Sequence, residues 1–547
     1  MSAKYIFVTG GVVSSIGKGI TVASIGRILK NRGFDISVIK LDPYLNVDPG
    51  TMSPYQHGEV FVTEDGGETD LDLGHYERFI DIELNKKSNV TAGQVYLSLI
   101  TKERKGDFLG GTIQTIPHVT NEIKHHITDL AESLDVDVMV VEVGGTVGDI
   151  EGLPFLEAIR QLRNDVGREN VYFIHLTLLP NLNVANELKT KPTQHSVSEL
   201  RSIGIQPDAL ICRSQEEVPD FVIDKLSLFC DVNKEEVIPL IDVDNVYRVP
   251  MILEGYGLGN SITKTLGLPP GSISNNNSWS AAISEMDALE EVVSIALVGK
   301  YVEYPDAYMS VKEAITHAGL RVGRRTQIKW VHSEDLERDG AEQHLSDVNG
   351  IVVPGGFGKR GVEGMILAAE YARTNNIPYL GLCLGMQVMI IEWCRNVLNL
   401  FQADSEEFQP DTPNPVIHVM PDQIDVTNKG GTMRLGMYPC SLDLKSKSHG
   451  FYESNSVEER HRHRFELNNA YREAMEESGI CFAGLSPDGT LVEIAESSQH
   501  DFMVGVQFHP EFRSRPTSPH PLFVGFLDSV KQMLREGAQF SFNEVET

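Results

Sequence analysis

Cysteine is scarce in this sequence, and its spacing excludes two kinds of structural framework. The 547 residues include only six cysteines, and no two of them form a C-x-x-C pair. Disulfide scaffolds and zinc ribbons need closely and regularly spaced cysteines. We therefore expect reduced thiols and a cytoplasmic protein. The six are Cys212, Cys230, Cys383, Cys394, Cys440 and Cys481.

Basic residues are also few. The chain has 47 Lys and Arg against 77 Asp and Glu, which gives a net charge of −30 with histidine neutral. A nucleic-acid-binding surface needs a basic face that displaces the counterions of the phosphate backbone. The composition therefore argues against nucleic-acid binding. It does not exclude nucleotides, which need only a few well-placed cations.

Long apolar runs are missing as well. The longest nearly apolar run, residues 379–391, is interrupted by Gln387. It is shorter than the roughly 20 residues of a membrane-spanning helix. The amino terminus leads into a glycine motif without the charged and apolar regions of a signal peptide. We expect no association with a membrane.

The sequence does contain short apolar segments that alternate with glycine turns and helical stretches, which is typical of α/β folds. The segments 136–143 and 171–178 are almost continuously apolar, as expected for parallel strands that are buried on both faces. We predict strands at 5–9, 36–41, 136–143, 171–178 and 294–298, and helices at 18–31 and 388–398.

Domain organisation follows from a change of composition near residue 270. Length alone, at about 150 residues per domain, would allow three or four domains. The segment 268–280 is rich in proline, glycine, serine and asparagine, and the α/β alternation resumes after it. We therefore predict two large α/β domains at 1–268 and 291–540, joined by a linker at 269–290.

A glycine-rich turn follows the first predicted strand and reads G-G-V-V-S-S-I-G-K-G at residues 10–19. Such a turn lets backbone N–H groups and a helix N-terminus face a phosphate, and Lys18 adds a positive charge. The spacing is one residue longer than in a usual P-loop, and Gly19 stands where Ser or Thr would bind magnesium. The alternative interpretation is an ordinary glycine turn of an α/β protein.

Without that hydroxyl, magnesium would need carboxylate ligands elsewhere. Glu142, at the end of an apolar strand, is one candidate. Asp72 is another, although spacing alone does not distinguish it from Asp70. The segment K-T-K-P-T-Q at 189–194 is a further phosphate-like feature, with two cations around a proline-stiffened turn. Its alternative interpretation is a solvated surface pair of lysines.

The second predicted domain contains a pattern for nucleophilic catalysis. G-L-C-L-G at 381–385 lies between an apolar strand and a helical stretch and has the form of a nucleophile elbow. This turn would place Cys383 at a helix N-terminus, where the dipole favours the thiolate. The other five cysteines are expected to be inert core residues.

A thiolate nucleophile needs a base and an acid that orients the base. His509 and Glu511, in H-P-E, follow an apolar segment at 503–508 and supply both groups. The glycines at 355–356 follow another apolar segment and offer backbone N–H groups to an oxyanion. Together these residues predict a Cys-His-Glu hydrolytic site.

These motifs carry a family resemblance. The second domain resembles class I glutamine amidotransferases, and the chain as a whole, over about residues 1–535, resembles the CTP synthase family. The segments that carry the resemblance are 10–19, K-L-D-P-Y-L-N-V-D-P-G (40–50), H-G-E-V-F-V-T-E-D-G-G (57–67), G-G-T-V-G-D-I-E (144–151), K-T-K-P-T-Q-H-S-V (189–197), G-L-C-L-G-M-Q (381–387) and E-R-H-R-H-R (459–464).

The resemblance implies a fold and a reaction. The fold would be an N-terminal P-loop-type, dethiobiotin-synthetase-like parallel-sheet domain followed by a class I glutamine amidotransferase α/β domain. ATP would phosphorylate the uracil 4-oxygen of UTP. Ammonia from glutamine would then displace the phosphate, which gives CTP, ADP, phosphate and glutamate.

The resemblance also implies roles for individual residues. The catalytic residues would be Cys383, His509 and Glu511, and the ligands of Mg²⁺, bound with ATP, would be Asp72 and Glu142. ATP would contact Ser15, Ile16, Gly17, Lys18, Gly19, Ile20, Asp72, Arg213 and Val243. UTP or CTP would contact Ser14, Lys40, Asp149, Ile150, Glu151, Lys189, Thr190, Lys191, Pro192, Thr193, Gln194 and Lys225. Glutamine would contact Gly356, Leu384, Gly385, Met386, Gln387, Glu407 and Arg464.

The family further implies GTP as an activator, CTP as an inhibitor and a homotetramer, with a mobile lid at 359–364. The motifs allow two alternative interpretations. One is an amidotransferase of the cobyrinic acid amide synthase kind, which would act on a carboxylate; the segments 40–67 and 189–194 argue against it. The other is a catalytically silent assembly protein, and the intact candidate residues argue against that.

Overall fold

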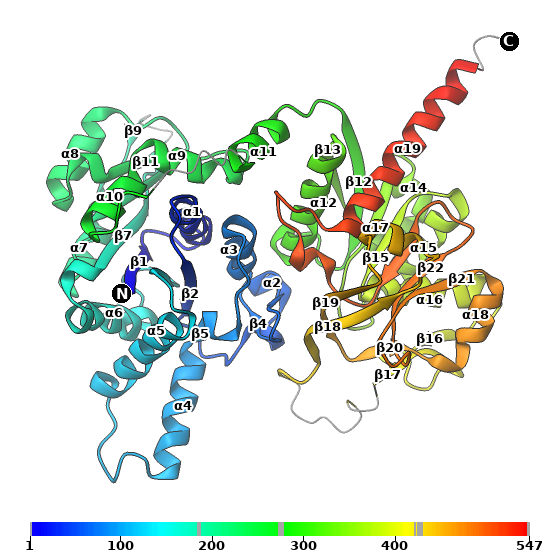
Figure 1. Cartoon of the computed structure of the whole chain (residues 1–547), viewed down its shortest axis with the longest axis horizontal. Coiled ribbons are helices and arrows are strands. Elements are labelled where there is room, and N and C mark those ends of the chain that lie inside the picture. Colours follow the sequence, from blue (N-terminus) through cyan, green and yellow to red (C-terminus); the bar gives the residue numbers. More distant parts are fainter. Residues whose placement is uncertain (1–2, 183–186, 272–277, 421–422, 424–429, 544–547) are drawn as a thin grey trace. The chain divides into compact units, whose positions relative to one another are not determined.

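The computed structural model describes residues 3–182, 187–271, 278–420, 423 and 430–543 (Figure 1). By its internal contacts the chain forms two compact units. The first comprises residues 1–49 and 72–283, and the second comprises 50–71 and 284–547. Among the described residues, no helix is both long and apolar enough to cross a membrane.

A seven-stranded parallel sheet forms the centre of the first unit (Figure 1). In spatial order its strands are β11 (Val237–Ile241), β10 (Ala209–Ser214), β7 (Val171–Leu178), β1 (Lys4–Gly10), β6 (Val138–Val143), β2 (Ile36–Asp42) and β5 (Asn89–Thr91). β1, β2 and β6 are buried along almost their whole length, because helices cover both faces of a parallel sheet. The predicted strands 5–9, 36–41, 136–143 and 171–178 are confirmed, with small differences at their ends.

Helices follow most of these strands. The predicted helix 18–31 is confirmed as α1, which begins after Gly17, a residue in the left-handed conformation with φ of 100°. The main helices are α1 (Lys18–Asn31), α3 (Asp72–Ile80), α4 (Ala92–Lys105), α5 (Thr120–Leu134), α6 (Leu153–Val166), α7 (Lys191–Ser202), α8 (Asp220–Cys230), α9 (Val249–Gly255), α10 (Leu258–Thr265) and α11 (Ser278–Asp287). Two short strands, β8 (Asn181–Leu182) and β9 (Glu187–Leu188), form a separate hairpin.

A nine-stranded mixed sheet forms the centre of the second unit. Its first five strands are parallel and the others are antiparallel. In order they are β13 (Arg325–His332), β12 (Val292–Gly299), β14 (Gly350–Val353), β15 (Tyr379–Leu382), β23 (Met503–Val506), β22 (Val492–Ser497), β21 (Ile480–Leu485), β18 (Arg434–Leu442) and β19 (Ser456–His463). Three further strands form a small sheet: β16 (Ala403–Ser405), β17 (Asn414–Val419) and β20 (Phe465–Leu467).

The helices of the second unit pack on this sheet and enclose two hydrophobic clusters. They are α12 (Met309–Val322), α13 (Ser333–Asp339), α14 (Ala341–Leu345), α15 (Val362–Asn375), α16 (Leu384–Asn396), α17 (Lys447–Tyr452), α18 (Arg472–Ser478) and α19 (Pro521–Asn543). The prediction of a helix at 388–398 is confirmed by α16, which starts four residues earlier because the elbow cysteine is its N-cap. Both units are therefore α/β, as predicted.

The structure differs from the predicted domain bounds at two places. Residues 50–71 group with the second unit, where they include α2 (Pro54–His57), β3 (Phe61–Val62) and β4 (Glu68–Thr69). The Ser310 backbone N–H donates to Glu59 at 2.9 Å, and Arg462 Nε donates to Glu68 Oε1 at 2.9 Å. Such contacts join residues hundreds of positions apart, so local composition carries no sign of them.

The second difference lies within the predicted linker at 269–290. Residues 278–287 form α11, and 272–277 lie outside the described residues. α11 is anchored by Trp279, whose Nε1 donates to the Tyr247 carbonyl at 3.1 Å and whose ring lies 5.6 Å from that of Phe79. A buried tryptophan supplies enough apolar contact to order a helix that propensity alone does not predict.

Candidate active sites

The glycine-rich turn after β1 packs too closely for side chains. A Cβ on Gly11 would lie 1.6 Å from Ser196 Oγ, and one on Gly10 would lie 2.8 Å from Lys18 Cδ. Lys18 Nζ donates to the Gly145 carbonyl at 2.7 Å, in the turn after β6. The ammonium thus lies between two turns at the carboxyl edge of the sheet, where ligands bind in open α/β sheets.

Asp72 lies against the same turn. A Cβ on Gly19 would be 1.9 Å from Asp72 Oδ1, so a side chain at position 19 would displace the Asp72 carboxylate. Asp72 Oδ2 also accepts a hydrogen bond from Lys40. Asp70, the alternative from sequence, instead pairs with His57 Nε2 at 3.2 Å within the second unit. Of the two acids, the structure places Asp72 beside the phosphate-type turn.

Glu142 completes a buried charged cluster with Asp72 and two lysines. Its Oε1 lies 3.8 Å from Lys40 Nζ, and its Oε2 accepts from the Tyr76 hydroxyl. Burial, with the nearby Asp72 carboxylate adding to it, raises the pKa of Glu142 to about 7. Burial would also raise the pKa of Asp72, but the Lys40 ammonium lowers it below its ordinary value. Burial lowers the pKa of Lys18, partly offset by Glu142.

The partly buried Asp72 and the buried Glu142, whose carboxylates both lie near Lys40 Nζ, fit a hard divalent cation. Asp72 and Glu142 disfavour each other's charge, and a cation between them would remove that conflict. Within the described residues, no group of three or more His, Cys, Asp or Glu side chains is arranged to hold a metal. Two carboxylates beside a phosphate-type turn match the way in which Mg²⁺ takes one or two carboxylates and completes its shell with water and phosphate oxygens.

A cavity of about 240 Å³ opens beside the glycine-rich turn in the first unit. It is lined by Arg213 and Val243, which were predicted to lie near adenine, and by Ile16, Gly17 and Ile20 of the turn. Arg213 is held in place because it donates to the Ile16 carbonyl at 3.0 Å and to Asp242 at 2.6 Å. Sequence reasoning missed the other lining residues, which are Thr21, Leu240, Ile241, Asp242, Val246 and Val249.

The residues predicted to contact UTP or CTP lie in separate places. Lys40 belongs to the charged cluster described above. Ile150 and Glu151 line another cavity of about 220 Å³, whose other walls are mainly apolar. The segment 189–194 follows β9. Its residue Thr193 is buried, and Thr193 Oγ1 donates to Thr177 Oγ1, on β7, at 3.2 Å. Neither of the two cavities is lined by residues 189–194.

Some predicted contacts in that segment already have partners. Lys189 pairs with Glu187 at 2.7 Å, and Gln194 Nε2 donates to Thr190 at 3.0 Å. Lys191 Nζ lies 5.6 Å from the centre of the Phe229 ring on α8, the helix that also carries Lys225. In the turn after β6, the Asp149 carboxylate accepts the Thr146 N–H at 3.2 Å.

In the second unit, the turn between β15 and α16 has the geometry of a nucleophile elbow. Cys383 has φ of 52° and ψ of −101°, a conformation that non-glycine residues rarely adopt. The flanking glycines have a steric reason: a Cβ on Gly381 would be 2.5 Å from the Gly385 carbonyl, and one on Gly385 would be 2.0 Å from the Val353 carbonyl oxygen. The tight turn projects Cys383 beyond the carboxyl end of β15.

His509 and Glu511 lie next to Cys383. His509 Nδ1 is 2.7 Å from Glu511 Oε1, and the imidazole stacks on the Phe512 ring. Burial by itself would lower the pKa of His509, but Glu511 and then Cys383 raise it to about 10. A Cβ on Gly355 would lie 2.8 Å from His509 Cε1 and 3.5 Å from Cys383 Cβ, so the glycine turn after β14 also adjoins the pair.

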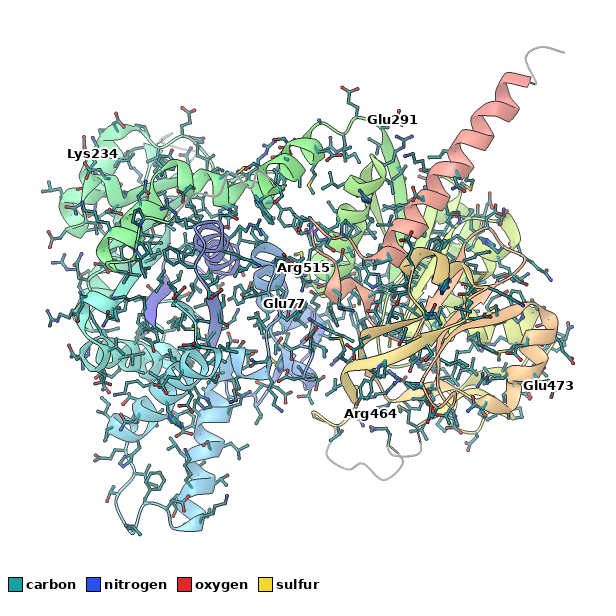
Figure 2. The ribbon with its side chains drawn as sticks, in the orientation of Figure 1. Glu77, Lys234, Glu291, Arg464, Glu473 and Arg515 are labelled. Carbon is teal, nitrogen blue, oxygen red and sulfur yellow. The ribbon has the colours of Figure 1, made fainter. Side chains whose placement is uncertain are left out.

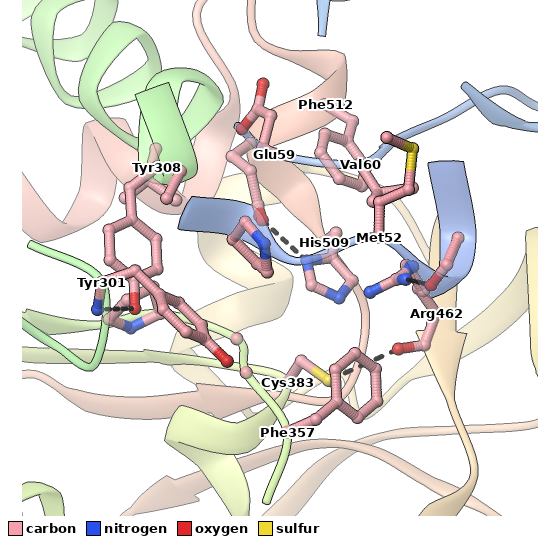
Figure 3. A pocket seen from close by; sticks show the side chains of 18 of the residues that line it. Met52, Glu59, Val60, Tyr301, Tyr308, Phe357, Cys383, Arg462, His509 and Phe512 are labelled. Carbon is pink, nitrogen blue, oxygen red and sulfur yellow. Dashed lines mark hydrogen bonds and ion pairs between the residues drawn. The ribbon is translucent and has the colours of Figure 1, made fainter. Parts of the chain in front are cut away.

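These groups open into a cavity of about 310 Å³ (Figure 3). Tyr301, Phe357 and Arg462 surround Cys383 and His509 in the figure. Sequence reasoning did not single out Tyr301 or Arg462, although Tyr301 follows β12 at the carboxyl edge of the parallel strands. Residues 50–60 supply another wall, in Gly50, Thr51, Met52, Pro54, Glu59 and Val60.

The predicted glutamine-contacting residues are only partly brought together. Gly356 lines the cavity. Glu407 accepts the Gly358 N–H at 2.6 Å, and burial raises its pKa. Arg464, labelled in Figure 2, lies between β19 and β20 and donates to Gln423 at 2.5 Å and Thr432 at 2.8 Å. Neither Glu407 nor Arg464 is among the residues that line this cavity.

Comparison with known proteins covers both units. A family model described as CTP synthase N-terminus matches residues 4–268, and one described as glutamine amidotransferase class-I matches residues 303–529. A CTP synthase of Dehalococcoides mccartyi (strain CBDB1) is 60% identical over 537 residues, which is 98% of this chain and 98% of that protein. A CTP synthase of Roseiflexus sp. (strain RS-1) is 60% identical over 538 residues, with 98% and 96% covered.

A solved structure is also similar. The glutaminase domain of Trypanosoma brucei CTPS with bound acivicin is 40% identical, covers 44% of this chain and 94% of that chain, and has a TM-score of 0.42. The curated relatives match both units at once, in the same order and over nearly the full length of each protein. The chain therefore belongs to the CTP synthase family.

Proposed function

We propose that this chain, a glutamine-hydrolysing ligase, converts UTP, ATP and glutamine to CTP, ADP, phosphate and glutamate. One observation carries the proposal. A single chain combines a Cys383–His509–Glu511 cluster on a cavity with a separate buried cluster of Lys18, Lys40, Asp72 and Glu142 beside a phosphate-type turn. The first arrangement suits amide hydrolysis, and the second suits phosphoryl transfer.

In the second unit, Cys383 acts as the nucleophile. Its thiol proton passes to His509, and Sγ bonds to the side-chain carbonyl carbon of glutamine. The N–H groups of Gly356 and Leu384 stabilise the oxyanion that forms. The C–N bond then breaks as His509 returns the proton to the leaving nitrogen, which departs as ammonia. Water hydrolyses the thioester to glutamate, and Glu511 orients the imidazole in both steps.

Substrate glutamine is held by both side chains and backbone. Leu384, Gly385, Met386 and Gln387 form the first turn of α16, whose N-terminus carries partial positive charge. Glu407 takes the α-ammonium and Arg464 the α-carboxylate. Because Glu407 and Arg464 already have hydrogen-bond partners, glutamine binding exchanges the Glu407–Gly358 and Arg464–Gln423 bonds for bonds to the substrate.

In the first unit, the turn residues Ser15, Ile16, Gly17, Lys18, Gly19 and Ile20 bind the ATP phosphates. Arg213 and Val243 bind adenine in the 240 Å³ cavity. Asp72 and Glu142 hold Mg²⁺, which supplies charge neutralisation for the transferred phosphoryl group when it is bound. Phosphorylation of the uracil 4-oxygen makes it a leaving group. Ammonia then bonds to the uracil carbon 4 that carries this oxygen, and the oxygen departs as phosphate.

UTP and the product CTP share their phosphate contacts. Ser14, Lys40, Lys225 and residues 189–194 bind the triphosphate, and 149–151 contact the nucleotide base or sugar. We further propose that CTP inhibits through this site, that GTP activates glutamine hydrolysis near the segment 359–364, and that the protein acts as a cytoplasmic homotetramer. These regulatory proposals rest on the family to which the chain belongs.

Substitution of the nucleophile tests the proposal. Cys383→Ala is expected to abolish CTP formation from UTP, ATP and glutamine, and to leave CTP formation with ammonia nearly unchanged. Cys481→Ala, the same change at a thiol away from the cavity, serves as the matched control and retains both activities. If the wild-type protein makes no CTP from UTP with either nitrogen source, the function is refuted. If Cys383→Ala keeps the glutamine-dependent reaction, the nucleophile is wrong.

A further inference from the structure

The sulfur of Cys383 lies next to the buried side-chain amide of Gln507, which is not among the residues that line the cavity. Gln507 follows β23, and Cys383 follows the adjacent parallel strand β15. The strand register pairs Leu382 with Val506, so the next residues, Cys383 and Gln507, become neighbours. Gln507 Nε2 lies 3.6 Å from Cys383 Sγ, within hydrogen-bond distance for sulfur. Gln507 is 1% exposed, so water does not compete for this contact.

A second glutamine determines which end of the Gln507 amide faces the sulfur. Gln387 Nε2, on α16, donates to the Phe465 carbonyl at 3.1 Å and to Gln507 Oε1 at 3.2 Å. A backbone carbonyl can only accept, so the NH₂ group of Gln387 must point toward Phe465. The other hydrogen of that NH₂ group then meets the Gln507 oxygen. Consequently the Gln507 NH₂ group is directed at Cys383.

We infer that Gln507, oriented by Gln387 and the Phe465 carbonyl, is a positioning residue that donates a hydrogen bond to the Cys383 sulfur and stabilises its thiolate. This inference deepens the proposed function and rests on Cys383 being the nucleophile. The thiol has a separate acceptor, since Cys383 Sγ lies 3.7 Å from the Arg462 carbonyl oxygen (Figure 3). When the proton leaves for His509, that contact loses its hydrogen, whereas the Gln507 donor gains a charged acceptor.

In this chain of hydrogen bonds, from the Phe465 carbonyl through Gln387 and Gln507 to Cys383, the Gln387 side chain orients Gln507 and does not contact the substrate. Gln387 is 4% exposed, and its NH₂ group is used by Phe465 and Gln507. It therefore acts through Gln507, while its backbone belongs to the first turn of α16. In this proposal the backbone of Gln387 contributes to glutamine binding, and its side-chain amide contributes to thiolate stabilisation.

The test measures thiolate formation without any substrate. Cys383 is alkylated with iodoacetamide over a range of pH, and the modified peptide is quantified by mass spectrometry. Gln507→Met removes the donor at nearly constant volume, and we expect the alkylation rate at neutral pH and kcat/KM for glutamine hydrolysis each to fall roughly tenfold, as for loss of one hydrogen bond to a charged group. The midpoint of the pH–rate curve should move upward. Ammonia-dependent CTP formation should not change.

Three further variants separate positioning from mere structural damage. Gln387→Met should change the same quantities in the same direction by a smaller factor, because Gln507 can then rotate. The double variant should lose no more than Gln507→Met alone, because the two residues act in series. Gln507→Glu, which keeps the shape of the side chain, should react more slowly still, since an oxygen would face the thiolate. Gln327→Met, on an exposed position of β13, is the matched control and should match the wild type.

The outcomes are decisive for the inference. A wild-type pH–rate curve in both Gln507→Met and Gln507→Glu overturns it. If the double variant instead loses alkylation rate and kcat/KM by the product of the two single losses, Gln387 does not act through Gln507. Failure of the proposed function would look different: the wild type would form no CTP from UTP, although Cys383 alkylation would still respond to Gln507.

Discussion

The Asp72 carboxylate occupies the space that a side chain at position 19 would fill, because a Cβ on Gly19 would lie 1.9 Å from Asp72 Oδ1. In a usual P-loop, a Ser or Thr hydroxyl at this position contacts magnesium. Here an acid from the start of α3 takes that place, and Lys40 binds its other oxygen. Glycine in place of Ser or Thr at position 19 therefore leaves the space in which the Asp72 carboxylate lies.

Gly19→Ala tests whether activity depends on this position of Asp72. The new methyl group displaces Asp72, so we expect CTP formation with ammonia to fall at least a hundredfold, in line with the loss of a well-oriented group in phosphoryl transfer. Initial-rate assays with saturating UTP and ATP measure this. Iodoacetamide labelling of Cys383 should be unchanged, because that residue belongs to the other unit.

The control for this change is Gly255→Ala. Gly255 is the last residue of α9, and nothing lies within 4 Å of a Cβ placed there. Alanine is favoured over glycine in a helix, so this variant should keep activity and lose no stability. An active Gly19→Ala would contradict the steric argument about Asp72.

Glu142→Gln tests the electrostatics of the buried cluster. Folding raises the pKa of Glu142 from its ordinary value of 4.5 to about 7, because the carboxyl group is buried. The folded state therefore binds this proton more tightly than the unfolded state, and the wild type loses stability as pH rises from about 4.5 to 7. Glutamine resembles the protonated acid, so the variant should lack this loss. Without nucleotide or metal, its free energy of unfolding should exceed that of the wild type by a few kcal/mol at pH 8.

Thermal and urea unfolding at pH 5 and pH 8 measure this difference. At pH 5 the two proteins should be almost equally stable, because Glu142 is then largely protonated. Added Mg²⁺ should stabilise the wild type more at pH 8 than at pH 5, and it should not stabilise Glu142→Gln to the same extent. Equal pH dependence in both proteins would show that Glu142 does not carry the shift.

Glu511→Gln probes the partner of the His509 imidazole. The variant keeps the shape of residue 511 but removes the charge that helps to raise the pKa of His509 to about 10. Glutamine hydrolysis should fall about 10²–10⁴-fold, as for other general-base sites that lose their orienting acid. Steady-state glutamate release measures this, and ammonia-dependent CTP formation should persist.

The same variant has a signature in stability. A raised histidine pKa contributes stability that is fully present below the unfolded value of 6.5 and is lost as pH rises through about 10. Between pH 7 and 10 the wild type should therefore lose stability more steeply than Glu511→Gln. Parallel curves across this range would mean that Glu511 does not hold the imidazolium.

Lys300→Met tests how the turn after β14 is held. Lys300 follows β12 and is 1% exposed, and its Nζ donates to the carbonyls of Phe357, at 3.2 Å, and Gly358. Burial lowers its pKa to about 8. Loss of these bonds frees the peptide next to Gly356, so we expect kcat/KM for glutamine hydrolysis to fall about tenfold, as for one or two neutral-to-charged hydrogen bonds.

Lys329→Met is the matched control for Lys300→Met. Lys329 lies on β13 and pairs with Asp347 at the surface, where such ion pairs contribute little. The wild-type rate of glutamine hydrolysis should also bend near pH 8, where Lys300 loses its charge, and Lys300→Met should lack that bend. A variant with unchanged kcat/KM would remove Lys300 from any role in positioning the turn.

Much of the fold could be predicted because its signals are local. The helix 18–31 is predicted from its place after a glycine turn, and the strands 136–143 and 171–178 from almost continuous apolar runs. The grouping of residues 50–71 with the second unit could not be predicted, because the Glu59–Ser310 and Glu68–Arg462 contacts join residues that are 251 and 394 positions apart. The positions of Lys300 and Tyr301 could not be predicted either. They lie at the site because they follow β12, which is next to β14 in the sheet.

The sequence by itself determined which groups are candidates for the chemistry, because Lys18, Cys383, His509 and Glu511 each stand in a short motif whose spacing has a steric or chemical reason. Only the tertiary structure decided which groups meet. The register of β15 against β23 places Gln507 beside Cys383, and the packing of α3 against α1 places Asp72, not Asp70, over Gly19. Contacts of this kind depend on how distant segments pack, and no local pattern of residues specifies them.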